Sequence, residues 1–167
     1  MENEQKAEEK RFVEEVGMFF EQTGVPRMAG RILGQLIISD PPHQCTNELS
    51  EALAASKGSI STMTRLLIQI GLIERLSLPA VRYDFFRIRP GAWTHMIKQS
   101  NDQLTAFRQL AERGLELFEN KSPLSRQWLE EMRDMYAFFE REFPALLERW
   151  EQERKETQAV STTNRNK

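Results

Sequence analysis

Apolar residues recur at helical spacing along most of this chain. Between residues 7 and 23 they fall every third or fourth position, and Gly24 can end that pattern. A second apolar stripe begins after Pro26, a residue that the first turn of a helix tolerates, and stops before the Pro41-Pro42 pair. The pattern therefore predicts two consecutive helices before residue 42.

The next segment changes from helical to strand periodicity. Thr46 is a candidate N-cap for a short helix, and Ser56 for a longer one that runs to Gly71. Two strands, at 72–76 and 83–88, then follow around a turn. A helix, a tight turn, a second helix and a hairpin together predict a winged helix-turn-helix.

The helix after Ser56 separates apolar from polar residues. Its apolar face consists of Ile60, Met63, Leu67 and Ile70. Its polar face, with the residues near its start, consists of Ser61, Thr62, Arg65, Gln69, Lys57 and Ser59. A polar helix face fits the major groove of DNA, where side chains read base edges. Arg65 is suited to guanine, Ser61 and Thr62 to several bases, and Ser59 to a phosphate.

The hairpin adds basic residues to this candidate interface. Arg82 lies at the predicted tip, where it could enter a minor groove, and Arg87 and Arg89 alternate on one strand, where they could contact the DNA backbone. Residues 56–90 carry a net charge of about +4, whereas residues 1–24 carry about −4, within a total of −2. A local basic segment is what phosphate binding requires, whatever the total.

Helical spacing returns after residue 90, breaks at 120–123, and continues to about 150. Helices this long extend beyond a small winged domain, and such an apolar seam usually packs on another chain. We therefore expect a homodimer. Its predicted contact residues are Phe12, Val16, Leu129, Met132, Tyr136, Phe139, Phe143, Leu147 and Trp150.

The expected fold class is mainly α with a small β-hairpin wing, and a winged helix-turn-helix domain carries long N- and C-terminal dimerisation helices. The expected domains are N-terminal dimerisation helices at 1–40, the DNA-binding domain at 41–90, C-terminal dimerisation helices at 91–155 and a disordered tail at 156–167.

Composition excludes several other classes. No apolar run approaches the roughly 20 residues that span a bilayer, and the charged N-terminus lacks a signal-peptide core, so we expect a cytoplasmic protein. Phosphate-binding glycine loops and nucleophile elbows are absent from the sequence, so we expect neither an enzyme nor a cofactor. Cys45, the single cysteine, could be a redox switch, although an inert thiol is the simpler interpretation. With His43 and the distant His95 it makes no plausible metal site.

The segment LSEALAASKGSISTMTRLLIQIGLIERL resembles the helix-turn-helix of MarR-type transcriptional regulators. The flanking segments VGMFFEQTGVPRMAGRILGQLIISDP and FFRIRPGAW are similar to a mycobacterial and actinobacterial subgroup that includes repressors of lipid and drug efflux pumps. The resemblance implies a homodimeric repressor that reads a palindrome in double-stranded DNA. One departure is Val81-Arg82 at the wing tip, where such proteins often carry an Asp-Arg pair.

The resemblance also implies a small hydrophobic or lipid-like effector. Residues that could line its pocket are Phe19, Phe20, Arg31, Leu36, Phe85, Trp93 and Phe107. Arg31 would hold a polar head group, while the plainer interpretation of the aromatic residues is a packed core. The alternative function is a winged-helix protein-interaction module without specific DNA binding, which would show little affinity for duplex DNA at moderate salt.

Overall fold

The computed structural model describes residues 2–79, 82–118 and 122–165, and the side chains of 3–79, 82–118 and 122–157. It divides into two compact units, the N-terminal unit (Met1–Met96) and the C-terminal unit (Ile97–Lys167). The helices before residue 40, which the sequence analysis set apart, belong to the same unit as the winged helix.

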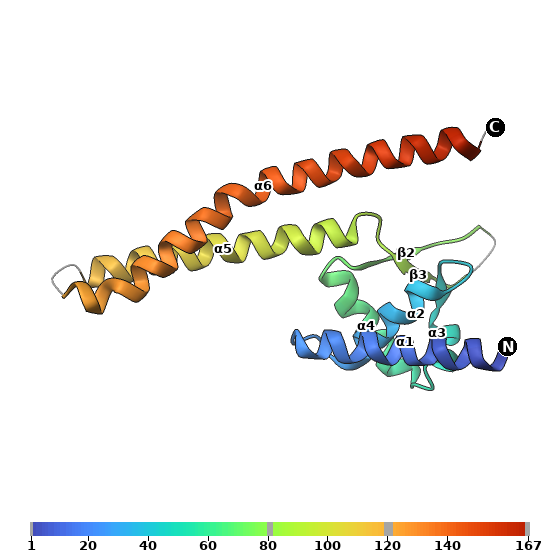
Figure 1. Cartoon of the computed structure of the whole chain (residues 1–167). Coiled ribbons are helices and arrows are strands. Elements are labelled where there is room, and N and C mark those ends of the chain that lie inside the picture. Colours follow the sequence, from blue (N-terminus) through green and yellow to red (C-terminus); the bar gives the residue numbers. More distant parts are fainter. Residues whose placement is uncertain (1, 80–81, 119–121, 166–167) are drawn as a thin grey trace. The chain divides into compact units, whose positions relative to one another are not determined.

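The N-terminal unit carries the predicted winged helix-turn-helix (Figure 1). Its helices before residue 90 are α1 (Glu2–Gln22), α2 (Arg27–Ile38), α3 (Thr46–Ala52) and α4 (Lys57–Gln69), and its strands are β1 (Gln44–Cys45), β2 (Ile73–Leu76) and β3 (Phe85–Ile88).

The three strands form one antiparallel sheet in the order β1-β3-β2. Cys45 pairs with Phe85, and Glu74 lies opposite Arg87. The sequence predicted the hairpin of β2 and β3 but not β1, because a strand of two residues has no periodicity to detect.

The start of α3 differs from the prediction by one residue. Cys45 is the N-cap, and Thr46 is the first residue of the helix. The backbone N–H of Cys45 donates to the carboxylate of Glu48 at 2.6 Å. This contact is one of the two hydrogen bonds of a capping box, in which the residue at the third helical position, here Glu48, fixes the start of the helix.

Two helices of the N-terminal unit, α1 and α4, are each followed by a glycine with a positive φ. Gly24 after α1 and Gly71 after α4 have φ values of +86° and +76°. After α4, the N–H of Gly71 donates to Ile68 and that of Leu72 to Leu67, both at 3.0 Å. This pair of hydrogen bonds is a Schellman motif, which needs a left-handed residue where Gly71 lies.

The core of the N-terminal unit draws on α1 to α4 and the sheet. Its fully buried large side chains are Ile32, Leu33, Leu36, Leu49, Ile60, Leu67 and Ile73. The helices α1 and α2 approach closely: a Cβ atom on Gly30 would lie only 2.9 Å from the Cα atom of Gly17, so the crossing has no room for a larger residue. Small residues at this crossing therefore bring α1 against the core.

Helix α5 (Ala92–Leu117) begins in the N-terminal unit, and its remainder forms the C-terminal unit with α6 (Pro123–Arg165). Within that unit the Phe107 and Tyr136 rings stack with centroids 4.9 Å apart, and a Cβ atom on Gly114 would lie 3.0 Å from Leu129. Facing apolar side chains thus pair the two helices.

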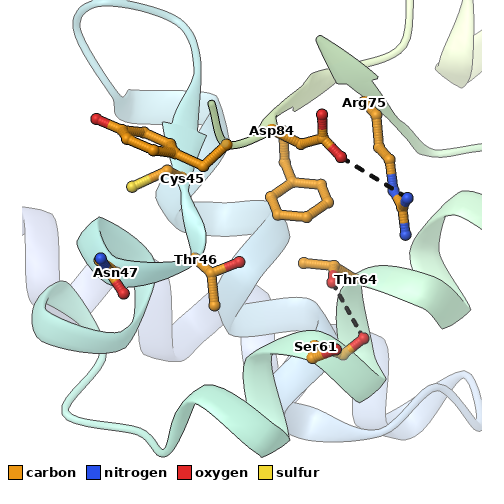
Figure 2. Close-up of a pocket in the computed structure, with 9 residues that line it drawn as sticks. Cys45, Thr46, Asn47, Ser61, Thr64, Arg75 and Asp84 are labelled. Carbon is orange, nitrogen blue, oxygen red and sulfur yellow. Dashed lines mark hydrogen bonds and ion pairs between the residues drawn. The ribbon is translucent and has the colours of Figure 1, made fainter. Parts of the chain in front are cut away.

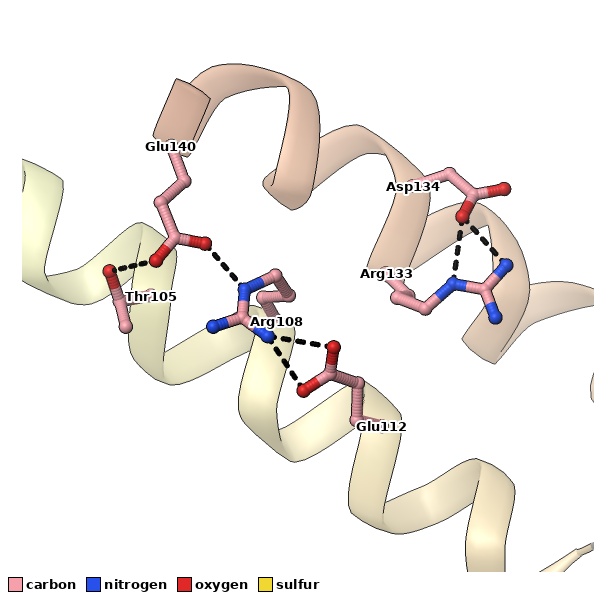
Figure 3. A network of polar contacts seen from close by, with 6 residues as sticks. All are labelled: Thr105, Arg108, Glu112, Arg133, Asp134 and Glu140. Carbon is pink, nitrogen blue, oxygen red and sulfur yellow. Dashed lines mark hydrogen bonds and ion pairs between the residues drawn. The ribbon is translucent and has the colours of Figure 1, made fainter. Parts of the chain in front are cut away.

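Polar contacts also join α5 to α6 (Figure 3). Arg108 pairs with Glu140 across the helices and with Glu112 at 2.7 Å along its own helix. The Glu140 carboxylate also accepts a hydrogen bond of 2.9 Å from Thr105. These contacts lower the pKa of Glu140, chiefly through the hydrogen bond from Arg108, and raise the pKa of Arg108.

The C-terminal tail corrects one expectation. Residues 156–165 continue α6, whereas the sequence predicted disorder from 156, and residues 166–167 lie outside the described part. The segment contains neither proline nor glycine, so nothing in it ends a helix that is already formed. None of the helices among the described residues combines the length and apolar character that crossing a membrane requires.

Candidate nucleic-acid interface

Helix α4 is capped at both ends. Ser56 is its N-cap, as the sequence predicted, and its side chain accepts a hydrogen bond of 3.2 Å from the N–H of Ser59. The cap satisfies a backbone donor that the helix cannot satisfy itself. With the glycine motif after its other end, α4 therefore has defined boundaries on both sides.

The apolar face of α4 packs into the core of the N-terminal unit. Ile60 and Leu67 are fully buried, while Met63 and Ile70 are half-buried. Thr64 is also buried, which the sequence analysis did not predict. Its hydroxyl donates to the carbonyl of Ile60 at 2.9 Å, so burying this polar group leaves no unpaired donor.

The opposite face of α4 is open to solvent. Ser61, Thr62, Arg65, Gln69 and Lys57 are exposed, whereas Ser59 is half-buried. The Nε of Arg65 donates to the carbonyl of Ser61 at 3.2 Å. This contact orients the side chain along the helix and leaves the two terminal nitrogens of its guanidinium for another acceptor.

Part of the positive charge of the wing is paired with carboxylates of the wing itself. Arg87 pairs with Glu74 on the neighbouring strand, with 2.6 Å between Nη2 and Oε1. Arg75 lies 3.7 Å from one carboxylate oxygen of Asp84, and Ser77 donates a hydrogen bond to the other. Opposite charges on paired strands stabilise the sheet, so Arg87 is less available to DNA than its sequence position suggested.

The remaining basic side chains of the segment are free of such pairs. Among the described residues, Lys57, Arg65, Arg82 and Arg89 form no ion pair with a carboxylate, and all four are exposed. Positive charge that no internal acid neutralises is what attracts a phosphate backbone. Val81, the predicted departure at the wing tip, lies outside the described residues.

A cavity of about 290 Å³ lies beside α4 within the N-terminal unit (Figure 2). Its lining residues are Cys45, Thr46, Asn47, Ser61, Thr64, Arg75, Tyr83, Asp84 and Phe86. The Cys45 side chain is only 6% exposed. Reaction with an oxidant requires access to the sulfur, and so the redox hypothesis gains no support from this burial.

The residues predicted to hold an effector have different environments. Phe20, Leu36 and Phe85 are buried, whereas Phe19, Trp93 and Phe107 are exposed. Arg31 lies near Glu14 of α1, with 2.6 Å between Nε and Oε1. None of these seven residues lines the cavity beside α4, and their role in ligand binding stays a prediction.

The predicted dimerisation residues also divide into two groups. Leu129 and Tyr136 contact α5 of the same chain, Val16 packs against the core of the N-terminal unit, and Met132, Phe143 and Leu147 are half-buried. The exposed members are Phe12, Phe139 and Trp150. This second group offers the most surface to a partner.

A longer exposed stripe on α6 was only partly predicted from the sequence, which indicated Phe139 and Trp150 but not the other four residues. It consists of Leu124, Trp128, Met135, Phe139, Leu146 and Trp150, which are 43–76% exposed. We call these six residues the α6 stripe. They repeat at intervals of eleven residues, which is close to three helical turns and keeps them on one face. This spacing was the signal that could have found them.

The similar proteins found by comparison are all described as transcriptional regulators. The family model of MmpR5-like MarR family transcriptional regulators matches residues 91–153. The HTH-type transcriptional regulator MmpR5 of Mycobacterium tuberculosis (strain ATCC 25618 / H37Rv) is 40% identical over 141 residues, which cover 84% of this chain and 86% of that protein. The putative HTH-type transcriptional regulator YvaV of Bacillus subtilis (strain 168) is 30% identical over 80 residues, or 48% of this chain and 45% of that protein. A crystal structure of a transcriptional regulator has 39% identity and a TM-score of 0.71, and the match covers 87% of this chain and 99% of that chain.

Proposed function

Because this chain belongs to the MarR family of transcriptional regulators, we propose that it represses transcription in the cytoplasm as a homodimer on a palindromic DNA operator. MarR proteins form a family of regulators rather than of enzymes. The proposal assigns sequence recognition to α4, backbone contacts to the wing, and dimerisation to the terminal helices.

The observation that carries the proposal is the outward face of α4. Ser61, Thr62 and Arg65 are exposed on a helix whose opposite face is buried and whose two ends are capped. The Thr62 hydroxyl donates to the carbonyl of Gly58 at 3.0 Å, so towards solvent it acts as an acceptor. A rigid helix with exposed polar side chains can enter the major groove without reorganising its core. Arg65 would donate to a guanine, and the two hydroxyl side chains would contact neighbouring bases.

Backbone contacts would come from the basic residues that no internal carboxylate neutralises. Three exposed residues are suited to contact phosphate oxygens: Lys57 at the start of α4, and Arg82 and Arg89 in the wing. Arg87 would contribute chiefly by holding β2 and β3 together through Glu74.

The homodimer is supported by the α6 stripe. Six large apolar side chains exposed on one face are unusual for a monomeric protein and mark an interaction surface. A second copy presents the same stripe, so the two can cover each other about a two-fold axis. Phe12, which is exposed on α1, is a separate candidate for contact with a partner subunit.

An effector would act by shifting the dimer away from the conformation that fits DNA. Phe19 and Trp93 are exposed aromatic residues among the predicted pocket positions and could contact a hydrophobic ligand. Oleate is a suitable probe: it should release the protein from DNA, while octanoate at the same concentration should release less because it buries less apolar surface. Equal release by both would contradict a hydrophobic effector site.

The decisive experiment is selection of DNA sites by the full chain from a pool of randomised duplexes. We expect enrichment of two inverted half-sites about one helical turn apart. Affinity for the enriched site should fall steeply between about 50 and 200 mM salt, because each neutralised phosphate releases counterions. An unenriched pool would reject the proposal and favour the protein-interaction module.

A further inference from the structure

Arg31, on α2, connects α1 to the turn between α3 and α4. Its Nε lies 2.6 Å from Oε1 of Glu14 on α1, and its Nη2 donates to the carbonyl oxygen of Leu53 at 3.1 Å. Leu53 is the C-cap of α3 and the first residue of the turn that leads to α4. One side chain therefore contacts both the first helix and the helix-turn-helix.

The site is built around this side chain. Gly17 on α1 leaves room for the stem of Arg31, because a Cβ atom there would lie 2.7 Å from the Arg31 Cγ. The Arg31 side chain is only 22% exposed. Its place at the crossing of α1 and α2 is thus fixed by packing as well as by charge.

The turn that Arg31 contacts has an unfavourable backbone. Ala54 has a φ of +50°, a left-handed conformation that residues with a Cβ atom rarely adopt. Inside the turn, the N–H of Ala55 donates to Ser50 at 3.0 Å, and the Ser50 hydroxyl donates back to Ala55 at 2.6 Å. These bonds shape the turn locally but do not attach it to α2. The hydrogen bond from Arg31 does, and a charged donor makes it stronger than a neutral one.

We propose that Arg31 is a positioning residue for DNA recognition. By holding the Leu53 carbonyl it sets the orientation in which α4 leaves the turn, and through Glu14 it couples that orientation to α1. DNA affinity then depends on a side chain that does not itself contact DNA. The inference rests on the proposed function, since the quantity it affects is binding to the operator.

Arg27 provides a matched control on the same helix. Its Nη2 lies 3.0 Å from the other carboxylate oxygen of Glu14, but among the described residues it has no contact with the turn. Replacing either arginine by methionine removes one positive charge and one ion pair to Glu14. Only Arg31→Met also removes the hydrogen bond to Leu53.

The experiment measures operator affinity by fluorescence anisotropy, at a temperature where circular dichroism shows that all three variants, Arg31→Met, Arg27→Met and Glu14→Gln, are folded. We expect Arg31→Met to bind at least ten-fold more weakly, Arg27→Met within about two-fold of wild type, and Glu14→Gln in between. The slope of log affinity against log salt should be unchanged in Arg31→Met. A slope reduced by about 0.9 would mean a lost phosphate contact and would overturn the positioning role, as would equal affinities of the two methionine variants.

Hydrogen exchange separates this inference from the proposed function. We expect the amides of Ala54 and Ala55 to exchange faster in Arg31→Met than in Arg27→Met, whether or not the protein prefers any DNA. If wild type selects no DNA site while this exchange difference is present, the proposed function fails and the coupling of Arg31 to the turn stands. Equal exchange in the two variants would overturn the inference. Arg31→Lys, which keeps the charge but cannot reach both partners, provides the same test if Arg31→Met does not fold.

Discussion

At the residue scale, recognition of a base depends on which donors remain after internal contacts are made. Arg65 uses its Nε to contact Ser61 and keeps both terminal nitrogens free on the exposed face of α4. Two parallel N–H groups match the O6 and N7 acceptors of guanine. The free terminal nitrogens are therefore suited to a bidentate contact, and a panel of DNA sequences distinguishes a guanine from a phosphate as its acceptor.

Replacing Arg65 by alanine tests this role. We expect Arg65→Ala to weaken binding to the selected site by about 1–3 kcal/mol and to relax the preference at one base pair in each half-site. The measurement is anisotropy against a panel of duplexes with single-base substitutions. Lys57→Ala is the control on the same helix and should weaken binding to every duplex alike. A loss that is uniform across the panel for Arg65→Ala would contradict base recognition.

The wing arginines show where a single sequence is insufficient at this scale. Alternation predicted Arg87 and Arg89 as equivalent DNA contacts, yet Arg87 is paired with Glu74 and Arg89 has no carboxylate partner among the described residues. That difference follows from the register that puts Glu74 opposite Arg87. Register depends on how the hairpin closes, which the sequence between the strands did not determine.

At the element scale, the residue after the C-cap of α4 must be glycine, because its position has no room for a Cβ atom. Gly71 has a φ of +76°, and a Cβ atom there would lie 2.6 Å from the imidazole of His95. Gly58, in the first turn of the same helix, has its nearest neighbour at 4.0 Å. The two glycines therefore occupy opposite environments.

Alanine at these two positions should change stability in opposite directions. Gly71→Ala should lower the free energy of unfolding by about 2 kcal/mol, because a strained backbone and a steric clash combine. Gly58→Ala should raise it by up to about 1 kcal/mol, because alanine favours the helix. Chemical denaturation monitored by circular dichroism measures both values. Similar effects at the two positions would show that the conformation of Gly71 is not required.

The pair between Arg108 and Glu140 predicts a pH dependence of the helical hairpin of α5 and α6. Arg108 lowers the pKa of Glu140 in the folded protein, so the carboxylate stabilises the fold above its unfolded pKa of about 4.3. That contribution should disappear as the pH falls through the lowered pKa. The melting temperature of Glu140→Gln should thus lie below that of wild type at pH 7, and the gap should close towards pH 3. A gap that does not change with pH would contradict this assignment; Glu131→Gln, at an exposed position on α6, is the control.

The sequence predicted the elements better than their edges. The helices were visible because their apolar residues repeat over three or more turns, and the ends at Gly24 and Gly71 follow from conformations that glycine adopts most easily. Strand β1 was not visible, since it exists only through pairing with β3. Cys45 at the cap of α3 was missed because a side chain from Glu48, inside the helix, determines that start.

At the scale of the whole molecule, the charge pattern matters more than the total charge. A chain with a net charge of −2 would repel DNA on average, but the segment at 56–90 carries about +4. Its acids pair with Arg75 and Arg87, so within the part of the chain that the structure describes the remaining basic side chains of the segment have no carboxylate partner. At physiological salt, where screening acts over about 8 Å, a phosphate beside this segment senses its basic side chains more strongly than the total charge of the chain.

The predicted dimerisation residues also show a limit of reasoning from one sequence. Spacing of three and four residues along α6 fits both its face towards α5 and its free face, so Leu129 and Trp150 were predicted together. The structure separates them, because Leu129 contacts Gly114 in the same chain while Trp150 remains exposed. Which face is internal depends on the pairing of two helices, and periodicity along one helix does not contain that information.

Recognition of a palindrome requires two copies of α4, so a change in the α6 stripe should act on DNA binding without touching the DNA-binding elements. Trp128 is 74% exposed, and Trp128→Glu places a charge in the surface where two copies would have to exclude water. We expect this variant to sediment as a monomer at micromolar concentration and to bind the full palindrome about as weakly as a single half-site. Gln127→Glu introduces the same charge at the adjacent exposed residue and should leave both properties unchanged. If Trp128→Glu remained a dimer, the stripe would not be the contact between subunits. If it became a monomer yet bound the palindrome with wild-type affinity, recognition would not need two copies of α4.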